Sequence, residues 1–573
     1  MKNILIAIRS IFKKGRHNVM KIVSLGIGLA VGLVLIAKVY FEQSYDDFYP
    51  DRDRVYQVWA KYQQNGGELK DYPQTSGGIA PTMQQQIPEI ETVTRYTSFG
   101  DWTFTMTDTK MKYSGRCIIA DSCFFDILPR PMLIGNAKEV LSTPMYVLVS
   151  SRIAKNIGGD VIGKNFTVDN SPGRTMTIGG VFEEVPENSH SRYDVIVSMA
   201  SAGRFMWEGS PTNMLGNDRY ISYVKLHKGV NPLALEEQVR TFVNSYFPPE
   251  EQQKVGLSID FSFHKLDNLH KELPQVKRMT WILSLLAFAL IFTAVMNYIL
   301  IVISSIVNRS KEVAVHKCYG ASENNIHGMM FGEALVHIVL SLILALLLIL
   351  AFRGTVEELL ATSLDSLLLS NGSLVLLGIC ILVFFVSGFM PGSLYARIPV
   401  ASAFRNYREN KRIWKKALLL VQFVATGFLV TMLVFVARQY TFMVNDRPGY
   451  AYENLAYCGL AGVDSTSRAK ILDEVMRLPG VAAATTVYQL PFEHASGNNI
   501  LLPGGTQELF NIADLYWVGN GYLDMMEIPV IQGRSFTENV TNSREVMVDR
   551  RFVEKMKLVA GWTDDVVGKD ICV

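Results

Sequence analysis

Charged residues are scarce in this chain of 573 residues. Lys, Arg, Asp and Glu make up 19% of it, less than the ~25% typical of soluble domains. The 55 basic residues nearly balance the 53 acidic ones and leave a net charge of +2, so the chain lacks the basic surplus of a nucleic-acid-binding protein. Hydrophobic residues reach 49%. Their concentration in separate blocks predicts several domains, part of them inside a membrane.

Cysteine is also sparse, and the six cysteines form no CxxC pair and no zinc-ligand spacing. We therefore expect no metal and no cofactor. Cys117 and Cys123 lie in a segment that we place outside the cytoplasm, where a disulfide between them and two separate buried thiols are both open alternatives. The string GGDVIGKN at residues 158–165 resembles a phosphate-binding loop but lacks the Ser or Thr that holds magnesium. It is interpreted as a turn.

Long apolar runs are what the sequence has in abundance. A helix that crosses a bilayer needs about 20 mostly apolar residues, and five runs qualify: residues 22–41, 281–307, 327–352, 374–396 and 418–437. The first run follows a basic N-terminus, as in a secretory signal, but lacks an A-x-A cleavage pattern and is interpreted as an uncleaved anchor. Residues 1–21 interleave apolar with basic side chains, which predicts an amphipathic helix on the inner face of the membrane.

The distribution of lysine and arginine predicts the orientation of these spans. Basic residues gather before the first span, between the second and third, and in the segment 397–417, whereas the loop between the third and fourth carries Glu357, Glu358 and Asp365. Cytoplasmic loops are enriched in Lys and Arg. We therefore expect a protein of the inner (plasma) membrane with a cytoplasmic N-terminus, and with residues 42–276 and 438–573 outside.

The first outer segment has the pattern of a mixed α+β domain. Alternating apolar and polar residues predict short strands, separated by glycine-containing turns, at residues 55–59, 103–106, 145–149, 176–181, 195–198 and 221–226. Helical stretches are predicted at residues 78–86 and 234–245.

An internal repeat relates the two outer segments. FFDILPRPMLIGN around Asp126 matches YLDMMEIPVIQGR around Asp524, and YVLVSSR and DVIGKNFTV have counterparts in EVMVDRR and DVVGKDICV. The fold class that we predict is a polytopic α-helical membrane protein with α+β extracytoplasmic domains, duplicated as one span, an outer domain and three spans. Val573 corresponds to Val168, so the second copy is expected to be incomplete.

The junction between the second and third spans carries a family motif. Residues 296–336 read MNYILIVISSIVNRSKEVAVHKCYGASENNIHGMMFGEALV, which closely resembles the FtsX-like permease family, whose members include MacB-type exporters and lipoprotein-release permeases. PGSLYARIPVASAFR at residues 391–405 is similar to a second family feature, and DDFYPDRDRVYQV at residues 46–58 resembles versions common in Bacteroidota. From the residues alone, residues 310–319 are expected to form a short helix that Gly320 ends and after which Ser322 caps the third span.

The resemblance implies a domain organisation and a partner-binding segment. It implies a MacB-like periplasmic core domain at residues 42–276, an FtsX-like permease domain at residues 277–396 with a cytoplasmic coupling segment at 308–325, a cytoplasmic linker at 397–417 and a second, incomplete periplasmic domain at 438–573. Residues that would contact or position an ATPase are Glu312, Lys317, Gly320 and Ala321. The alternative is a basic turn that only fixes the topology.

A few polar residues lie within the predicted spans. Ionisable side chains in a bilayer are candidates for function, but Glu333 and His337 are near the cytoplasmic end of their span, which favours a helix–helix hydrogen bond over a proton relay. Asn297 is likewise interpreted as an interhelical contact. His190, with Ser189 and Asp194 nearby, matches a hydrolase only by residue type, and no catalytic residue is predicted.

The resemblance implies a non-catalytic permease subunit that converts the motion of a separate ABC ATPase into movement of periplasmic domains. The chain lacks the LSGGQ signature, so ATP hydrolysis is assigned to another subunit. The expected assembly is a permease homodimer or heterodimer with two ATPases, together with a periplasmic adaptor or outer-membrane component as a further candidate partner. Cargo candidates are peptides, macrolide-like drugs and lipoproteins. The alternatives are an FtsX-like transducer that regulates a cell-wall hydrolase and a membrane sensor receptor.

Overall fold

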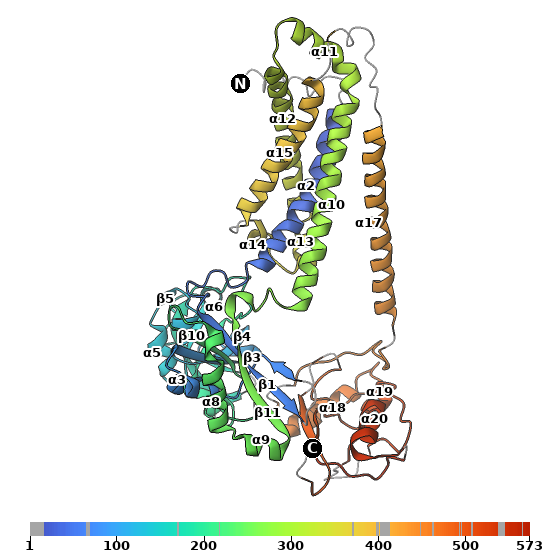
Figure 1. Cartoon of the computed structure of the whole chain (residues 1–573). Coiled ribbons are helices and arrows are strands. Elements are labelled where there is room, and N and C mark those ends of the chain that lie inside the picture. Colours follow the sequence, from blue (N-terminus) through green and yellow to red (C-terminus); the bar gives the residue numbers. More distant parts are fainter. Residues whose placement is uncertain are drawn as a thin grey trace.

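The fold was analysed in a computed structural model. It describes residues 17–573 except 65–68, 169–170, 217, 369–371, 397–399, 401–412, 447, 461–462, 492, 494–495, 506–507, 537–544 and 564. Most of the predicted N-terminal helix and of the 397–417 linker therefore lies outside the described residues. Figure 1 shows a helical bundle with an α+β domain at one end and a short helix at the other.

Five helices in the described residues are long and apolar enough to cross a membrane, which confirms the five predicted spans. They are α2 (Asn18–Gln43), α10 (Pro274–Ser304), α12 (Glu323–Ala351), α15 (Ser373–Ala396) and α17 (Ile413–Asn445). The first begins before residue 22, and α10 begins at Pro274, so that the expected boundary at 276/277 falls inside a helix. The reason is that the first turns of α10 are polar and carry no hydropathy signal.

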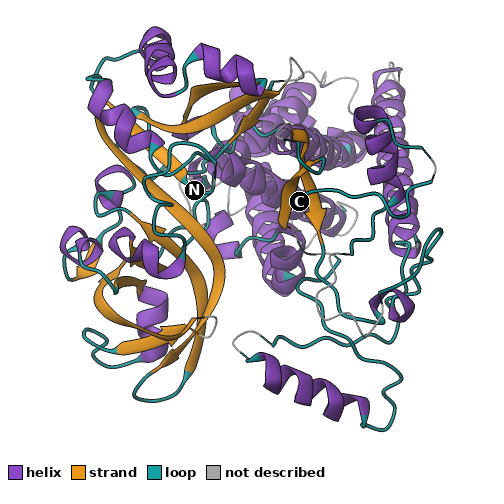
Figure 2. Ribbon diagram, turned by 90° about the horizontal axis from the view of Figure 1, so that it is seen from below, coloured by secondary structure: helices purple, strands orange, loops and turns teal. Residues whose placement is uncertain are grey.

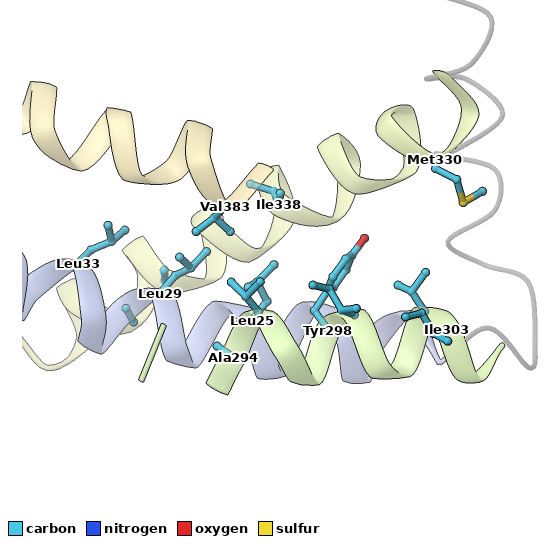
Figure 3. Close-up of a cluster of buried hydrophobic side chains, with 14 of the residues drawn as sticks. Leu25, Leu29, Leu33, Ala294, Tyr298, Ile303, Met330, Ile338 and Val383 are labelled. Carbon is cyan, nitrogen blue, oxygen red and sulfur yellow. The ribbon is translucent and has the colours of Figure 1, made fainter. Parts of the chain in front are cut away.

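The core of the bundle is aliphatic and centres on α2. Leu25, Leu29 and Leu33 of α2 pack with side chains of α10, α12 and α15, as the labelled residues of Figure 3 show. Gly28 and Gly32 allow α2 to approach α10 closely. A Cβ at Gly28 would lie 2.2 Å from Ala294 Cβ, and a Cβ at Gly32 would lie 2.4 Å from Ile291 Cγ1, both on α10. Small residues four apart are a known means of bringing two membrane helices together.

α17 stands apart from the other four spans. It runs alongside α10 in Figure 1, but only 6% of its apolar window is buried within the chain, compared with 44% for α2 and α10. Its surface is left for lipid or protein to cover.

The α+β domain contains a sheet in which the strand order is β11-β1-β10-β3-β4-β9-β6-β8-β5, with β2 beside β1 and β7 beside β3 and β8. The strands are β1 (Val55–Gln64), β2 (Lys70–Tyr72), β3 (Ile90–Met106), β4 (Lys112–Ala120), β5 (Met132–Ile134), β6 (Tyr146–Ser150), β7 (Asn165–Val168), β8 (Ser171–Phe182), β9 (Val195–Ser198), β10 (Ile221–Leu226) and β11 (Leu257–Lys265). All six predicted strands are confirmed. β4–β9 and β6–β8 are parallel pairs and the other neighbours are antiparallel.

Helices cover this sheet, as Figure 2 shows. They are α3 (Ile79–Gln86), α4 (Phe124–Ile127), α5 (Ala137–Ser142), α6 (Ser151–Ile157), α7 (Ala202–Phe205), α8 (Glu236–Tyr246) and α9 (Pro249–Val255). The helices predicted at 78–86 and 234–245 correspond to α3 and α8. Both cysteines of this region are free thiols. Cys117 is buried in the sheet, whereas the Cys123 thiol donates to the Val93 carbonyl at 3.0 Å, so the disulfide alternative is wrong.

The segment after α17 is much less densely packed. Its elements are α18 (Ser465–Met476), β12 (Ser496–Leu501), β13 (Glu508–Leu515), α19 (Tyr522–Met525) and α20 (Arg550–Ala560). Ile500 and Met556 are the buried residues of its cluster. β12 and β13 pair with each other, and the backbone of Cys572 forms an isolated antiparallel β-bridge with that of Leu501.

Candidate functional site

The site suggested by the family motif is a helical corner at the end of the bundle remote from the α+β domain. A short helix, α11 (Ile306–Cys318), follows α10 after Ser305 and precedes α12, so the predicted helix is confirmed and begins four residues earlier than expected. Val313 and Ala314 are both 1% exposed and belong to the core of the bundle. The helix is therefore anchored to the spans through one face (Figure 1).

The end of α11 has the geometry that the sequence predicts. Gly320 has φ of +87°, a left-handed conformation that glycine adopts without a Cβ penalty. The Ala321 N–H donates to the His316 carbonyl at 3.0 Å, and the Gly320 N–H donates to that of Lys317 at 3.0 Å. Such bonds satisfy carbonyls at a helix C-terminus. The Ser322 side chain then accepts a hydrogen bond from the Asn325 N–H and caps α12, so both cap predictions are confirmed.

The four residues predicted to contact an ATPase all lie at this corner, with different exposure. Glu312, Lys317 and Ala321 are half-buried and Gly320 is exposed. Other exposed residues of this corner were not predicted to contact an ATPase: Lys311, Val315, His316 and Tyr319, whose side chain is 89% exposed. We call these four residues and Gly320 the corner surface. An aromatic residue directly before the helix-ending glycine was the signal available for Tyr319.

A buried polar cluster lies in the spans between α2, α10 and α12. Lys21 is 0% exposed, and its Nζ lies 3.7 Å from Glu333 Oε1. His337 Nδ1 lies 3.1 Å from the Tyr298 hydroxyl, and the Ser341 hydroxyl donates to the Ile22 carbonyl at 3.1 Å. Glu333 and His337 thus contact neighbouring spans, as expected for interhelical contacts.

Asn297 is not part of this cluster. It is half-buried on α10, and its side chain makes no hydrogen bond to another described residue, so its interhelical role stays a prediction. The sequence did not predict Lys21 and Tyr298 as interhelical contacts. Lys21 belongs to the basic residues that flank the first span, and no local pattern indicates which distant residue either side chain meets.

The residues with hydrolase-like types are not assembled for catalysis. His190 contacts Asp46 at 2.5 Å and the Tyr223 hydroxyl. Asp194 instead pairs with Arg152 at 2.6 Å. Among the described residues, no group of three His, Cys, Asp or Glu side chains could hold a metal ion.

Two family models match parts of the chain. Residues 20–242 match the family model of the MacB-like periplasmic core domain, and residues 284–400 match that of the FtsX-like permease C-terminal domain. The first match extends from α2 to α8, and the second includes α11 and its glycine corner. No curated protein matches the chain significantly.

Several solved structures are similar to part of the chain. A domain of a putative permease protein from Porphyromonas gingivalis is 32% identical, covers 38% of this chain and 91% of its own, and has a TM-score of 0.35. The periplasmic region of MacB from Actinobacillus actinomycetemcomitans is 15% identical, with coverages of 38% and 91% and a TM-score of 0.26. The extracellular domain of the noncanonic ABC-type transporter YknZ from Gram-positive bacteria is 10% identical, with coverages of 36% and 98% and a TM-score of 0.26.

Proposed function

Because this chain belongs to the family of FtsX/MacB-type ABC permeases, we propose that it converts the motion of an ATPase into movement of its α+β domain. The chain is a multi-pass inner-membrane protein and a permease subunit, and its family implies association with an ABC ATPase subunit. Export or release of a substrate from the outer side is the action that we assign to this movement.

The observation that carries the proposal is the way α11 is built. One face of the helix is fixed in the bundle through Val313 and Ala314, while the corner surface is open. A partner that pushes on Tyr319 and Gly320 therefore moves α10 and α12 with it, since a packed helix transmits displacement as a rigid element. The α+β domain lies at the other end of these same spans (Figure 1).

The orientation that we propose places the corner surface in the cytoplasm and both outer segments in the periplasm. The excess of Lys and Arg before α2, at α11 and before α17 supports this orientation. The assembly that we propose pairs two permeases, identical or different, with two ATPases. Glu312, Lys317, Gly320 and Ala321 would contact or position the ATPase.

The interior of the spans favours handling of the substrate outside the membrane. In the described residues, the core of the bundle consists mostly of aliphatic side chains, with one polar cluster near the α11 end and a second around Lys38 and Glu42 at the opposite end. The aliphatic stretch between them offers no polar lining for a solute. A peptide, macrolide-like drug or lipoprotein is the class of cargo that we propose. The same closed bundle also suits an FtsX-like transducer that regulates a cell-wall hydrolase without transport.

We further propose that the segment after α17 is a second copy of the α+β domain. Several local features support this. α4 and α19 are both four residues long and are followed at the same spacing by left-handed glycines, Gly135 with φ of +86° and Gly533 with +87°. Farther on, Ser150 caps α6 and Asp549 caps α20, each by accepting from the backbone N–H three residues on.

The proposal predicts that an ATPase is held through the corner surface. A candidate ABC ATPase would be co-expressed with the chain and purified through a tag on the permease, and retention and ATP turnover would be measured. We expect Gly320→Trp, which places a bulky side chain on the corner surface, and Glu312→Arg, which reverses a charge beside it, each to lower retention about tenfold or more.

Gly229→Trp is the matched control, because Gly229 has φ of +85° and open space around it like Gly320 but lies in the α+β domain. Equal retention in Gly320→Trp and Gly229→Trp would show that the corner surface is not the binding site. If no ATPase co-purified with the wild-type chain, the sensor-receptor alternative would take the place of the permease proposal.

A further inference from the structure

The α+β domain meets the spans at three places at the end of the bundle that faces the domain. Residues 44–54 connect α2 to β1, and residues 266–273 connect β11 to α10. The third place is not a chain connection but a turn at residues 361–364, between α13 (Arg353–Leu360) and α14 (Leu364–Leu368), in the connection from α12 to α15. We call the third segment the outer turn.

The two chain connections are fastened to each other. Glu42 Oε2, at the end of α2, lies 2.6 Å from His270 Nε2. The ring of Tyr45 stacks on His270 with 3.4 Å between centroids and 7° between planes. Lys271 Nζ lies 3.5 Å from Asp47. α2 and α10 therefore enter the domain as one unit.

A loop of the domain, residues 186–192, is locked onto the end of α2. The Asp46 N–H donates to the Asn188 carbonyl at 2.8 Å, and the Asn188 side-chain amide donates to the Ser44 carbonyl at 2.7 Å. Asp46 is 0% exposed and left-handed, with φ of +59°, and its carboxylate contacts Ser189 at 2.9 Å and His190 at 2.5 Å. Buried, fully bonded polar networks of this kind are rigid.

The outer turn contacts both α2 and this loop. Lys38 Nζ donates to the Thr362 hydroxyl at 2.7 Å and pairs with Glu42 at 2.7 Å, with both charged side chains buried. The Ser363 N–H donates to the Glu187 carboxylate at 3.0 Å. Hydrogen bonds that involve a charged group are about twice as strong as neutral ones, and here two such bonds hold one short turn.

We propose that the outer turn is a second input into the α+β domain, through which movement of α12 and α15 reaches the domain by way of Glu187. This inference rests on the proposed function. The joined ends of α2 and α10 act as a single pivot for the domain. The hydrogen bond between Ser363 and Glu187 lies beside that pivot. Through this bond, sliding of α12 and α15 against α2 would tilt the domain. Glu187 is thus a positioning residue, since it acts through the outer turn.

The contact itself is tested in the full chain without an ATPase, by backbone hydrogen exchange in nanodiscs. We expect Glu187→Ala to speed exchange at residues 361–364 by about tenfold, because the Ser363 N–H loses its acceptor. Glu187→Gln, which keeps the size and an acceptor oxygen, should give a smaller change. The control is Glu184→Ala, whose carboxylate faces Arg152 at 3.5 Å rather than the spans. Unchanged exchange in Glu187→Ala would overturn the proposal.

The transmission is tested in the assembly with its ATPase. On addition of a non-hydrolysable ATP analogue, we expect exchange in the wild type to change at residues 361–364 and 186–192 together. In Glu187→Ala we expect it to change only at residues 361–364. In a separate assay with ATP, turnover by Glu187→Ala should stay within about twofold of the wild type. A response of residues 186–192 that survives in Glu187→Ala would overturn the proposal. Failure of the proposed function is visible separately as absence of the ATPase from the purified complex, and the exchange experiment without ATPase does not depend on it.

Discussion

At the scale of single residues, one energetically costly feature is a charged pair inside the bundle. Lys21 is fully buried next to Glu333. Burying one charge without a partner costs several kcal/mol. Each of these side chains therefore offsets part of the desolvation cost of the other. The pair specifies how α2 and α12 face each other rather than adding much stability, because desolvation offsets most of the attraction.

A second group of charges lies outside the membrane and predicts a pH dependence. Asp51 pairs with Lys225 at 2.6 Å, and Glu91 pairs with Arg54 at 2.7 Å. Hydrogen bonds from Lys225 hold the pKa of Asp51 below its usual range, and those from Arg54 do the same for Glu91. Because these pKa values are depressed in the folded state, the stabilisation is present at neutral pH and is lost as pH falls through the folded values.

We therefore expect the melting temperature of the α+β domain to fall as the pH is lowered from about 5 to about 3. Thermal unfolding would be followed by circular dichroism across this range. Lys225→Met should give a shallower pH dependence, since Asp51 loses the first of its partners. An identical slope in Lys225→Met and the wild type would mean that other carboxylates cause the effect.

At the scale of secondary-structure elements, the close contact of α2 and α10 depends on two glycines. A Cβ at Gly28 would lie 2.2 Å from the Cβ of Ala294, too near for two carbon atoms. Lipid supplies no hydrophobic driving force between helices, so the association depends on this close packing.

Gly28→Ala is expected to destabilise the bundle by about 1–3 kcal/mol through overpacking. Adding Ala294→Gly should recover most of the loss, because it removes the atom that the new methyl group meets. Gly378→Ala on α15 is the control, since nothing lies within 4 Å of a Cβ there. The measurement is unfolding in detergent with a denaturant, and a double variant no more stable than Gly28→Ala would argue against direct contact of these residues.

At the scale of the whole molecule, the two outer segments differ in how much they bury. The α+β domain contains three clusters of buried apolar residues. In the described part of the segment after α17, the cluster has Ile500 and Met556 as its buried members. Stability follows the density of buried contacts, and regions with few of them open locally at low cost.

Limited proteolysis should therefore cut the chain first after α17. We expect brief trypsin treatment of the full chain in nanodiscs to cleave within residues 448–573 at least tenfold faster than within residues 44–273. A tenfold ratio corresponds to a difference of about 1.4 kcal/mol in the free energy of local opening. Mass spectrometry of the fragments identifies the sites. Equal rates in the two segments would contradict the difference in packing.

The sequence alone determined the elements and several of their ends. Apolar runs of sufficient length located the five spans, and alternation located strands such as β9 and β10, because helix and strand periodicity are properties of the local backbone. Gly320 and Ser322 marked the end of α11 and the start of α12 for the same reason, since a left-handed residue and a capping hydroxyl act within one turn. The corner, but not Tyr319 as its most exposed side chain, was therefore visible in the sequence.

Only the tertiary structure decided which distant residues meet. Lys38 and Thr362 are 324 positions apart, and the partners of Lys21, Asp46 and Glu187 depend on how the helices rotate and where loops return to the membrane surface. No local pattern encodes these pairings, because each is a consequence of packing over the whole chain. The same reason accounts for His190, which lies next to Ser189 in the sequence and yet pairs with Asp46 at the end of α2.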